Sequence, residues 1–134
     1  MAHRKRTDMG YTVLLWCITL SYMGLIFYLS SQHTIPFVKL PGYFDKVAHL
    51  CAYVPLSFMF FLSMQKSGMR KYVFAAAFLT ACIYGITDEF HQSFVPGRTP
   101  EFGDFIADTI GAYLGSLGGM HYNAISLGIK GLFQ

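Results

Sequence analysis

The sequence predicts an all-α, polytopic membrane protein, built as one compact bundle of four transmembrane helices. Hydrophobic residues make up 54% of the 134 residues and charged residues only 13%, whereas soluble domains carry about 25% charged residues. The apolar residues also gather in runs long enough to cross a bilayer, with short polar breaks between them. The net charge of +3 is too small to indicate a nucleic-acid partner, so the lipid bilayer is the expected partner.

The first apolar run covers residues 11–29 and matches the roughly 20 residues that a helix needs to span a bilayer. It exceeds the apolar core of a signal peptide, so we expect an uncleaved helix. Three further spans follow, at residues 47–64, at residues 72–87 with an extension to residue 94, and at residues 105–120. In the last of these, Gly111, Gly115 and Gly119 recur every four residues, a pattern typical of close helix packing in membranes.

The connections between these spans are short, which favours sequential antiparallel helices. Basic residues predict their orientation, because Lys and Arg are enriched in cytoplasmic loops. They precede the first span and fill the connection between the second and third spans: Arg4, Lys5, Arg6, Lys66, Arg70 and Lys71. We therefore expect both termini in the cytoplasm, with a basic N-terminal segment at 1–10, the membrane domain at 11–120 and a C-terminal tail at 121–134.

The second span begins with a polar face at the outer membrane boundary. Asp45, His49 and Tyr53 are spaced four residues apart and therefore share one side of the helix. Lys46 directly follows the first of them. Taken alone, this pattern also fits a helix cap followed by packing residues at the membrane interface.

The end of the third span holds the densest group of polar residues in the chain. Asp88, Glu89, His91 and Gln92 lie within five residues, and Tyr84 shares a face with the first of them. Ionisable side chains inside membrane spans are rare and commonly mark a site or a pathway. A charged and solvated helix end is the alternative interpretation.

The fourth span begins with two acids one turn apart, Asp104 and Asp108, and Arg98 lies in the loop before it. Helix capping explains Asp104 equally well, whereas Asp108 lies one turn deeper. Arg98 either remains solvated, neutralises these acids, or binds an anionic group such as a phosphate through its planar fork. Because antiparallel packing brings the three polar segments to one end of the bundle, the sequence predicts an outward-facing polar site.

Four motifs stand at the outer ends of the spans. They are Ser30-Ser31-Gln32, Asp45-Lys46-x-x-His49-x-x-x-Tyr53, Tyr84-Gly85-x-x-Asp88-Glu89-x-His91-Gln92-x-Phe94-x-Pro96-Gly97-Arg98, and Asp104-x-x-x-Asp108-x-x-Gly111-x-x-x-Gly115. Together they resemble the VanZ-like family of bacterial integral membrane proteins. The resemblance covers residues 30–119, and its most specific part is the D-E-x-H-Q block with the P-G-R that follows it.

This resemblance implies a multi-pass protein of the bacterial cytoplasmic (inner) membrane with a role at the cell envelope. The founding member of the family lowers susceptibility to teicoplanin, a glycopeptide antibiotic that acts outside the cell on envelope precursors. The resemblance therefore implies a link to antibiotic resistance but no particular reaction. Many relatives carry Asn at the position of Asp108, so this chain has an additional ionisable group there.

The first functional hypothesis is that the polar site binds or acts on a lipid-linked or glycan component of the envelope. In this interpretation Asp88 or Glu89 is the general acid or base, and His49 or His91 relays the proton, with Asp45 beside them. The expected substrate-binding residues are Arg98, Gln92, Lys46, Tyr53, Asp104 and Asp108. Whether the protein is an enzyme stays open.

Two other classes of function are also compatible with the sequence. One is transport of a small ligand or of protons, for which four helices are few unless the chain forms a homo-oligomer. The other is a non-catalytic membrane scaffold, in which the polar side chains only hold the helices together. A scaffold would tolerate Glu89→Gln, whereas an enzyme or a proton path would not.

No cofactor is predicted. A divalent metal is the alternative, with ligands drawn from Asp45, His49, Asp88, His91 and Asp104. It is not favoured, because the sequence contains neither H-E-x-x-H nor H-x-x-E-H spacing. The cysteines Cys17, Cys51 and Cys82 have no C-x-x-C spacing either, so we expect no disulfide framework and no zinc finger.

Overall fold

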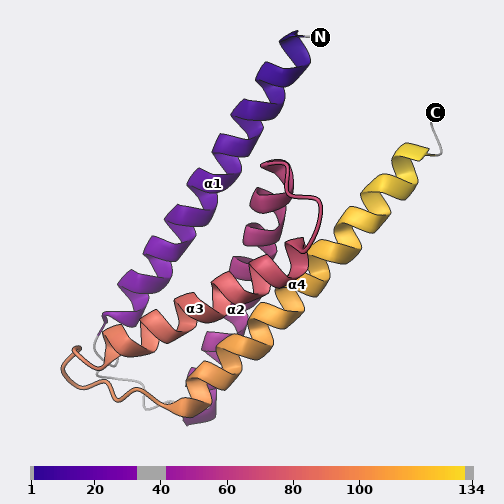
Figure 1. Cartoon of the computed structure of the whole chain (residues 1–134). Coiled ribbons are helices and arrows are strands. Elements are labelled where there is room, and N and C mark those ends of the chain that lie inside the picture. The colour runs from indigo at the N-terminus through magenta and orange to yellow at the C-terminus, as the bar shows by residue number, and fades with distance from the viewer. Residues whose placement is uncertain (1, 33–41, 132–134) are drawn as a thin grey trace.

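The computed structural model describes residues 2–32 and 42–131 and consists of four α-helices in that part of the chain. They are α1 (Ala2–Ser30), α2 (Gly42–Lys66), α3 (Val73–Gln92) and α4 (Phe102–Gly131). Successive helices run in opposite directions, so α1 begins and α4 ends at the same end of the molecule (Figure 1). The predicted all-α bundle is confirmed. Residue 1 of the predicted N-terminal segment and residues 132–134 of the predicted tail lie outside the described residues.

Three of the helices are long and apolar enough to cross a membrane. Their candidate spans are Met9–Ser30, Tyr43–Lys66 and Val73–Gln92, of 22, 24 and 20 residues. The 30-residue helix α4 is not among them, because its many glycines and its polar residues lower its mean hydropathy. It completes the bundle by packing along α2 and α3.

The exterior of the bundle is more apolar than that of a soluble protein, and its core contains buried polar side chains beside apolar ones such as Leu56. Large apolar residues such as Leu20, Ile83 and Phe90 are 58%, 62% and 67% exposed. Polar residues such as Thr19 and Ser57, in contrast, are fully buried between the helices. An apolar exterior is expected when the surrounding solvent is lipid, so the chain is a membrane protein.

Glycines let α4 approach α2 closely. A Cβ on Gly111 would lie 2.6 Å from the carbonyl oxygen of Leu50, and one on Gly115 would collide with the carbonyl oxygen of Val54. Only glycine fits against backbone at such distances. The predicted glycine ridge therefore serves packing, and it draws the start of α4 toward the polar face of α2.

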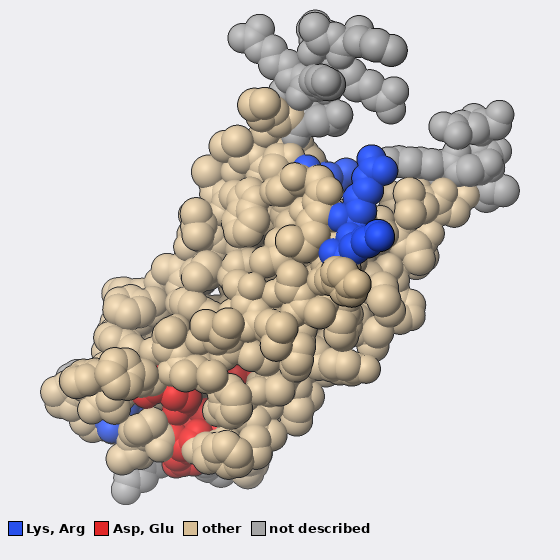
Figure 2. Space-filling view, in the orientation of Figure 1, with Lys and Arg blue, Asp and Glu red and all other residues tan. Residues whose placement is uncertain are grey.

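The acidic side chains and the largest group of basic side chains gather toward opposite ends of the bundle (Figure 2). Figure 2 shows the acidic residues gathered at the end where the loop between α3 and α4 lies, with the basic patch near the opposite end. Lys66, Arg70 and Lys71 lie in and next to the connection between α2 and α3, and all three are exposed. The acidic end is the one that the sequence predicts to carry the site.

Candidate functional site

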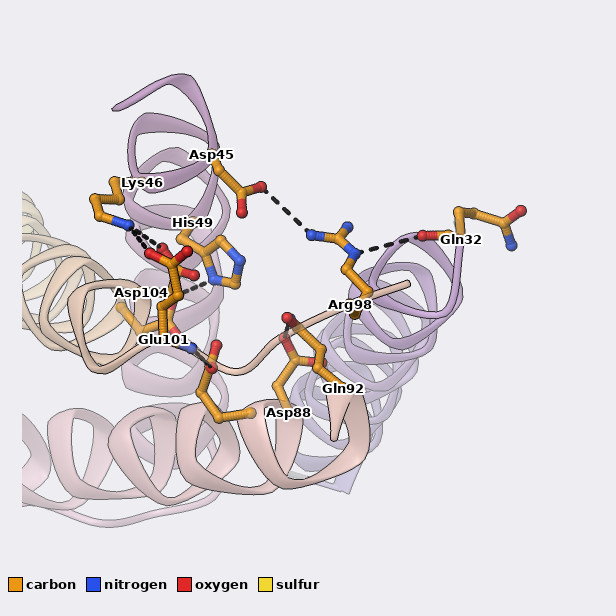
Figure 3. A network of polar contacts seen from close by, with 11 residues as sticks. Gln32, Asp45, Lys46, His49, Asp88, Gln92, Arg98, Glu101 and Asp104 are labelled. Atoms are coloured by element: carbon orange, nitrogen blue, oxygen red, sulfur yellow. Dashed lines mark hydrogen bonds and ion pairs between the residues drawn. The ribbon is translucent and has the colours of Figure 1, made fainter. Parts of the chain in front are cut away.

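A tight turn after α3 carries Arg98 back toward the ends of α1 and α2. The backbone N–H of Arg98 donates to the Val95 carbonyl at 3.1 Å, and Gly97 adopts a φ of 83° that disfavours a side chain. From this turn, Nη1 lies 3.5 Å from Asp45 Oδ1, and Nε donates to the Gln32 carbonyl at 3.4 Å (Figure 3). Arg98 thus connects the loop with α2 and with the end of α1.

Lys46 holds the start of α4 against α2. Its ammonium donates to Glu101 Oε2 at 2.6 Å and to Asp104 Oδ1 at 3.1 Å (Figure 3). Gly103 leaves room for this side chain, because a Cβ there would lie 2.7 Å from Lys46 Cε. The hydrogen bond from Lys46 lowers the pKa of the Glu101 carboxyl, which stands outside the spans. One cation therefore compensates two carboxylates.

Deeper in the bundle, His49 on α2 faces Asp108 on α4. His49 Nδ1 and Asp108 Oδ1 are 2.9 Å apart, and the Asp108 side chain is 0% exposed. Gly85 on α3 makes room for this carboxylate, because a Cβ there would lie 3.1 Å from Asp108 Oδ2. That second oxygen is buried and has no hydrogen-bond partner within the described part of the chain. It is open to a further ligand.

A cavity of about 130 Å³ adjoins His49, with walls from α1, α2 and α3 and from Arg98. Three of its polar groups are buried without a hydrogen-bond partner among residues 9–32 and 43–128: the hydroxyls of Ser30 and Tyr53, and Asp88 Oδ1. Buried polar groups are nearly always hydrogen-bonded in native proteins. These three groups are therefore open to a partner such as water or a bound ligand.

Two further polar residues complete the floor of the site. Gln92 Nε2 donates to Asp88 Oδ2 at 3.1 Å, which orients that carboxylate (Figure 3). Glu89 Oε2 accepts a hydrogen bond from the backbone N–H of Glu101 at 3.1 Å, whereas its Oε1 is buried without a partner in the described residues. Each acid at the end of α3 is thus held through one oxygen and left open at the other.

Two groups of side chains have the composition and spacing of a metal site. One ligand atom each from His49, Glu89 and Asp108 lies within 4.8 Å of the other two, and the same holds for Asp45, His49 and Asp104. Both groups share His49 of α2. The first adds Glu89 of α3 and Asp108 of α4, and the second adds Asp45 of α2 and Asp104 of α4. This explains why no metal-binding spacing is visible along the chain.

His91 and Tyr84 are directed toward α1 rather than toward the cavity. His91 Nε2 and Ser31 Oγ are 2.9 Å apart, and its ring stacks on Phe27 with 4.1 Å between the ring centroids. The Tyr84 hydroxyl donates to the Met23 carbonyl at 2.7 Å. In this structure His91 connects α3 with α1, and only His49 of the two histidines lines the cavity.

The other predicted site residues meet at this end of the bundle. They are Asp45, Lys46, His49, Tyr53, Asp88, Glu89, Gln92, Arg98, Asp104 and Asp108. Their catalytic and binding roles stay predictions. Sequence reasoning missed Glu101 and gave Ser30 no role in the site. Only the position of Ser30 in the first family motif could have drawn attention to it, and no spacing pattern marks Glu101.

A comparison with protein families gives one informative result. The model of the family described as VanZ/LLP1 matches residues 9–122. This stretch contains every residue that lines the cavity and both groups of metal-compatible side chains. The chain matches no curated protein and no solved structure.

Proposed function

The chain belongs to the VanZ-like family, and from this premise we propose that it binds or acts on a component of the cell envelope at its polar end. The observation that carries the proposal is the cavity beside Arg98, in which Ser30, Tyr53 and Asp88 each present a buried polar atom without a partner in the described chain. Such a cavity suits a ligand that supplies several hydrogen-bonding atoms at once.

The lining of the cavity favours an amphipathic ligand with an anionic headgroup. Within the described residues the Arg98 side chain makes two long contacts, at 3.4 and 3.5 Å, and an arginine carries five N–H donors that match phosphate oxygens. Ile26 and Leu29 of α1 and Ala52 of α2 form apolar walls beside these polar groups. A lipid-linked precursor combines a phosphate with a hydrocarbon chain, so it fits this lining better than a free sugar does.

The same lining supplies groups for acid and base chemistry. Asp88 and His49 both line the cavity, and Gln92 holds Asp88 in place through one oxygen. A positioned carboxylate and a positioned imidazole are the usual general acids and bases of hydrolases and transferases. Asp88 is therefore our first candidate for the proton-transferring group.

The proposal requires that the acidic end faces outward from a bacterial inner membrane. Both the start of α1 and the end of α4 lie at the opposite end of the bundle (Figure 1). Lys66, Arg70 and Lys71 are exposed in and next to the connection between α2 and α3, and Figure 2 shows Lys and Arg side chains gathered toward that end. An excess of Lys and Arg is typical of cytoplasmic segments, so we place both termini in the cytoplasm.

Complementation of a deletion strain tests the proposed site. Arg98→Ala and Asp88→Asn are expected to abolish the effect on susceptibility to a teicoplanin-type glycopeptide while membrane abundance stays normal. Arg70→Ala removes the same charge at the opposite, exposed end and is the matched control, which should behave as the wild type. Wild-type susceptibility in both site variants would overturn the proposal. Lost abundance in both would instead support the scaffold hypothesis.

A further inference from the structure

The acidic end carries more negative charge than its cations compensate. Among the described residues, the carboxylates there are Asp45, Asp88, Glu89, Glu101, Asp104 and Asp108, against the side-chain cations Lys46 and Arg98. Lys46 is paired with Glu101 and Asp104, and Arg98 with Asp45. Among the described residues, Asp88, Glu89 and Asp108 have no cation except His49, although a buried carboxylate without a counter-charge is strongly unfavourable.

Two of these carboxylates, Asp108 and Glu89, meet between α3 and α4. Asp108 is 0% exposed, and its Oδ2 lacks a partner in the described structure and faces α3 at Gly85. Glu89 lies one turn beyond Gly85 on the same side of α3, and its Oε1 is also buried without a partner among the described side chains. With His49, these residues place one ligand atom each within 4.8 Å of the others.

We propose that His49, Glu89 and Asp108 bind one divalent transition-metal ion. The donor set is one imidazole nitrogen and carboxylate oxygens, which suits Zn²⁺ or Mn²⁺, whereas Ca²⁺ and Mg²⁺ prefer oxygen ligands alone. The ion supplies the counter-charge that Glu89 and Asp108 lack. The ion coordinates the unpaired oxygen of each carboxylate, so neither carboxylate needs to be protonated.

This ion would lie next to the cavity, because His49 contributes to both. A divalent ion there would polarise an oxygen of a ligand whose anionic group is bound by Arg98. That role deepens the proposed function and rests on it. Binding of the ion itself does not, because it requires no substrate.

Metal titration of the purified full-length protein in lipid nanodiscs tests the site. After removal of metal with a chelator, the wild type should bind one Mn²⁺ or Zn²⁺ per chain. Glu89→Gln and Asp108→Asn should each weaken binding at least about tenfold. Glu101→Gln is the matched control, because it removes the same charge from an exposed residue outside the cluster. It also keeps the backbone N–H of residue 101, which donates a hydrogen bond to Glu89. Equal affinities in Glu89→Gln and Glu101→Gln would overturn the proposal.

A spectroscopic measurement on the wild type tests whether the bound metal ion has a nitrogen ligand. The electron spin echo of bound Mn²⁺ should be modulated by a coordinated ¹⁴N in the wild type, and this modulation should disappear in His49→Gln. Its absence from the wild type would also overturn the site. Arg98→Ala separates the two proposals: it should retain metal affinity while losing the susceptibility phenotype. If Arg98→Ala kept both its metal affinity and the wild-type phenotype, the metal site would stand and only the proposed function would be refuted.

Discussion

The two halves of the bundle use polar residues in different ways. In the half toward the termini, buried hydroxyls are paired: Ser57 Oγ lies 2.6 Å from Ser116 Oγ, and Thr19 Oγ1 lies 3.0 Å from Ser63 Oγ. All buried side-chain atoms found without a partner in the described structure lie in the half with the acidic end, on Ser30, Tyr53, Asp88, Glu89 and Asp108. Paired groups hold helices together, whereas unpaired groups point to a ligand.

The largest expected effect is a loss of stability when the close packing of α4 against α2 is disrupted. Gly115→Leu should destabilise the bundle by about 3 kcal/mol, because a Cβ there collides with the Val54 carbonyl oxygen and lies 3.0 Å from Phe58 N. Thermal unfolding in detergent, with membrane abundance, measures the loss. Gly128→Leu on the same helix is the matched control, since nothing lies within 4 Å of its Cβ. Equal stability of the two variants would contradict the packing role of the glycine ridge.

A second, smaller effect on stability is expected at Asp108, one of the buried residues with an unpaired oxygen. In the presence of a chelator, Asp108→Asn should stabilise the protein by about 1 kcal/mol, because it removes one of three buried carboxylates that share His49 as their only described cation, and Asn retains an acceptor for His49. Thermal unfolding measures this gain. Asp45→Asn is the control, because that side chain is 47% exposed and paired with Arg98. A loss of stability in Asp108→Asn would indicate that the carboxylate has a structural role after all.

A smaller effect is expected at the paired hydroxyls. A double-mutant cycle of Ser57→Ala and Ser116→Ala should give a coupling free energy of about 0.6 kcal/mol, the usual strength of interhelical hydrogen bonds in membranes. The two single variants and the double variant should keep the wild-type susceptibility phenotype, because the pair is satisfied within the bundle. Loss of the phenotype in these variants would contradict the claim that paired polar groups only hold the helices together.

The smallest effect concerns the exposed pair of Lys46 and Glu101. Because the folded protein lowers the pKa of Glu101 from 4.5, the pair contributes stability above about pH 4.5, and this contribution is lost as the pH falls through the lowered value. Glu101→Gln should therefore lower the melting temperature slightly at neutral pH and not in strong acid. A difference that persists unchanged in acid would show that Glu101 acts other than through its charge.

The sequence predicts the helices well and their internal contacts poorly. Spans such as residues 11–29 are visible because each helix must be apolar over a bilayer's thickness, which is a local property. The helix α4 is the partial exception, because its glycines and serines serve contact with α2 rather than contact with lipid. Its apolar character is consequently weaker than that of the other three helices.

The site was predictable as a location and not as an arrangement. Short connections between antiparallel spans already bring Asp45, Asp88 and Asp104 to one end. The spacing within α3 placed His91 near Asp88 just as the spacing within α2 placed His49 near Asp45, but α3 turns His91 toward Ser31 and Phe27 of α1. A residue's place along a helix predicts its face, and only the neighbouring helices decide what that face contacts.

The sequence by itself determined the membrane environment, the number and order of the helices and the end at which the ionisable residues gather, because these depend on local hydropathy and on short loops. The tertiary structure alone decided which carboxylates have counter-charges. Lys46 compensates Asp104 and Glu101, while Glu89 and Asp108 each keep an open oxygen. That difference arises because distances between helices depend on small residues such as Gly85 and Gly111, whose effect is exerted only against a neighbouring helix.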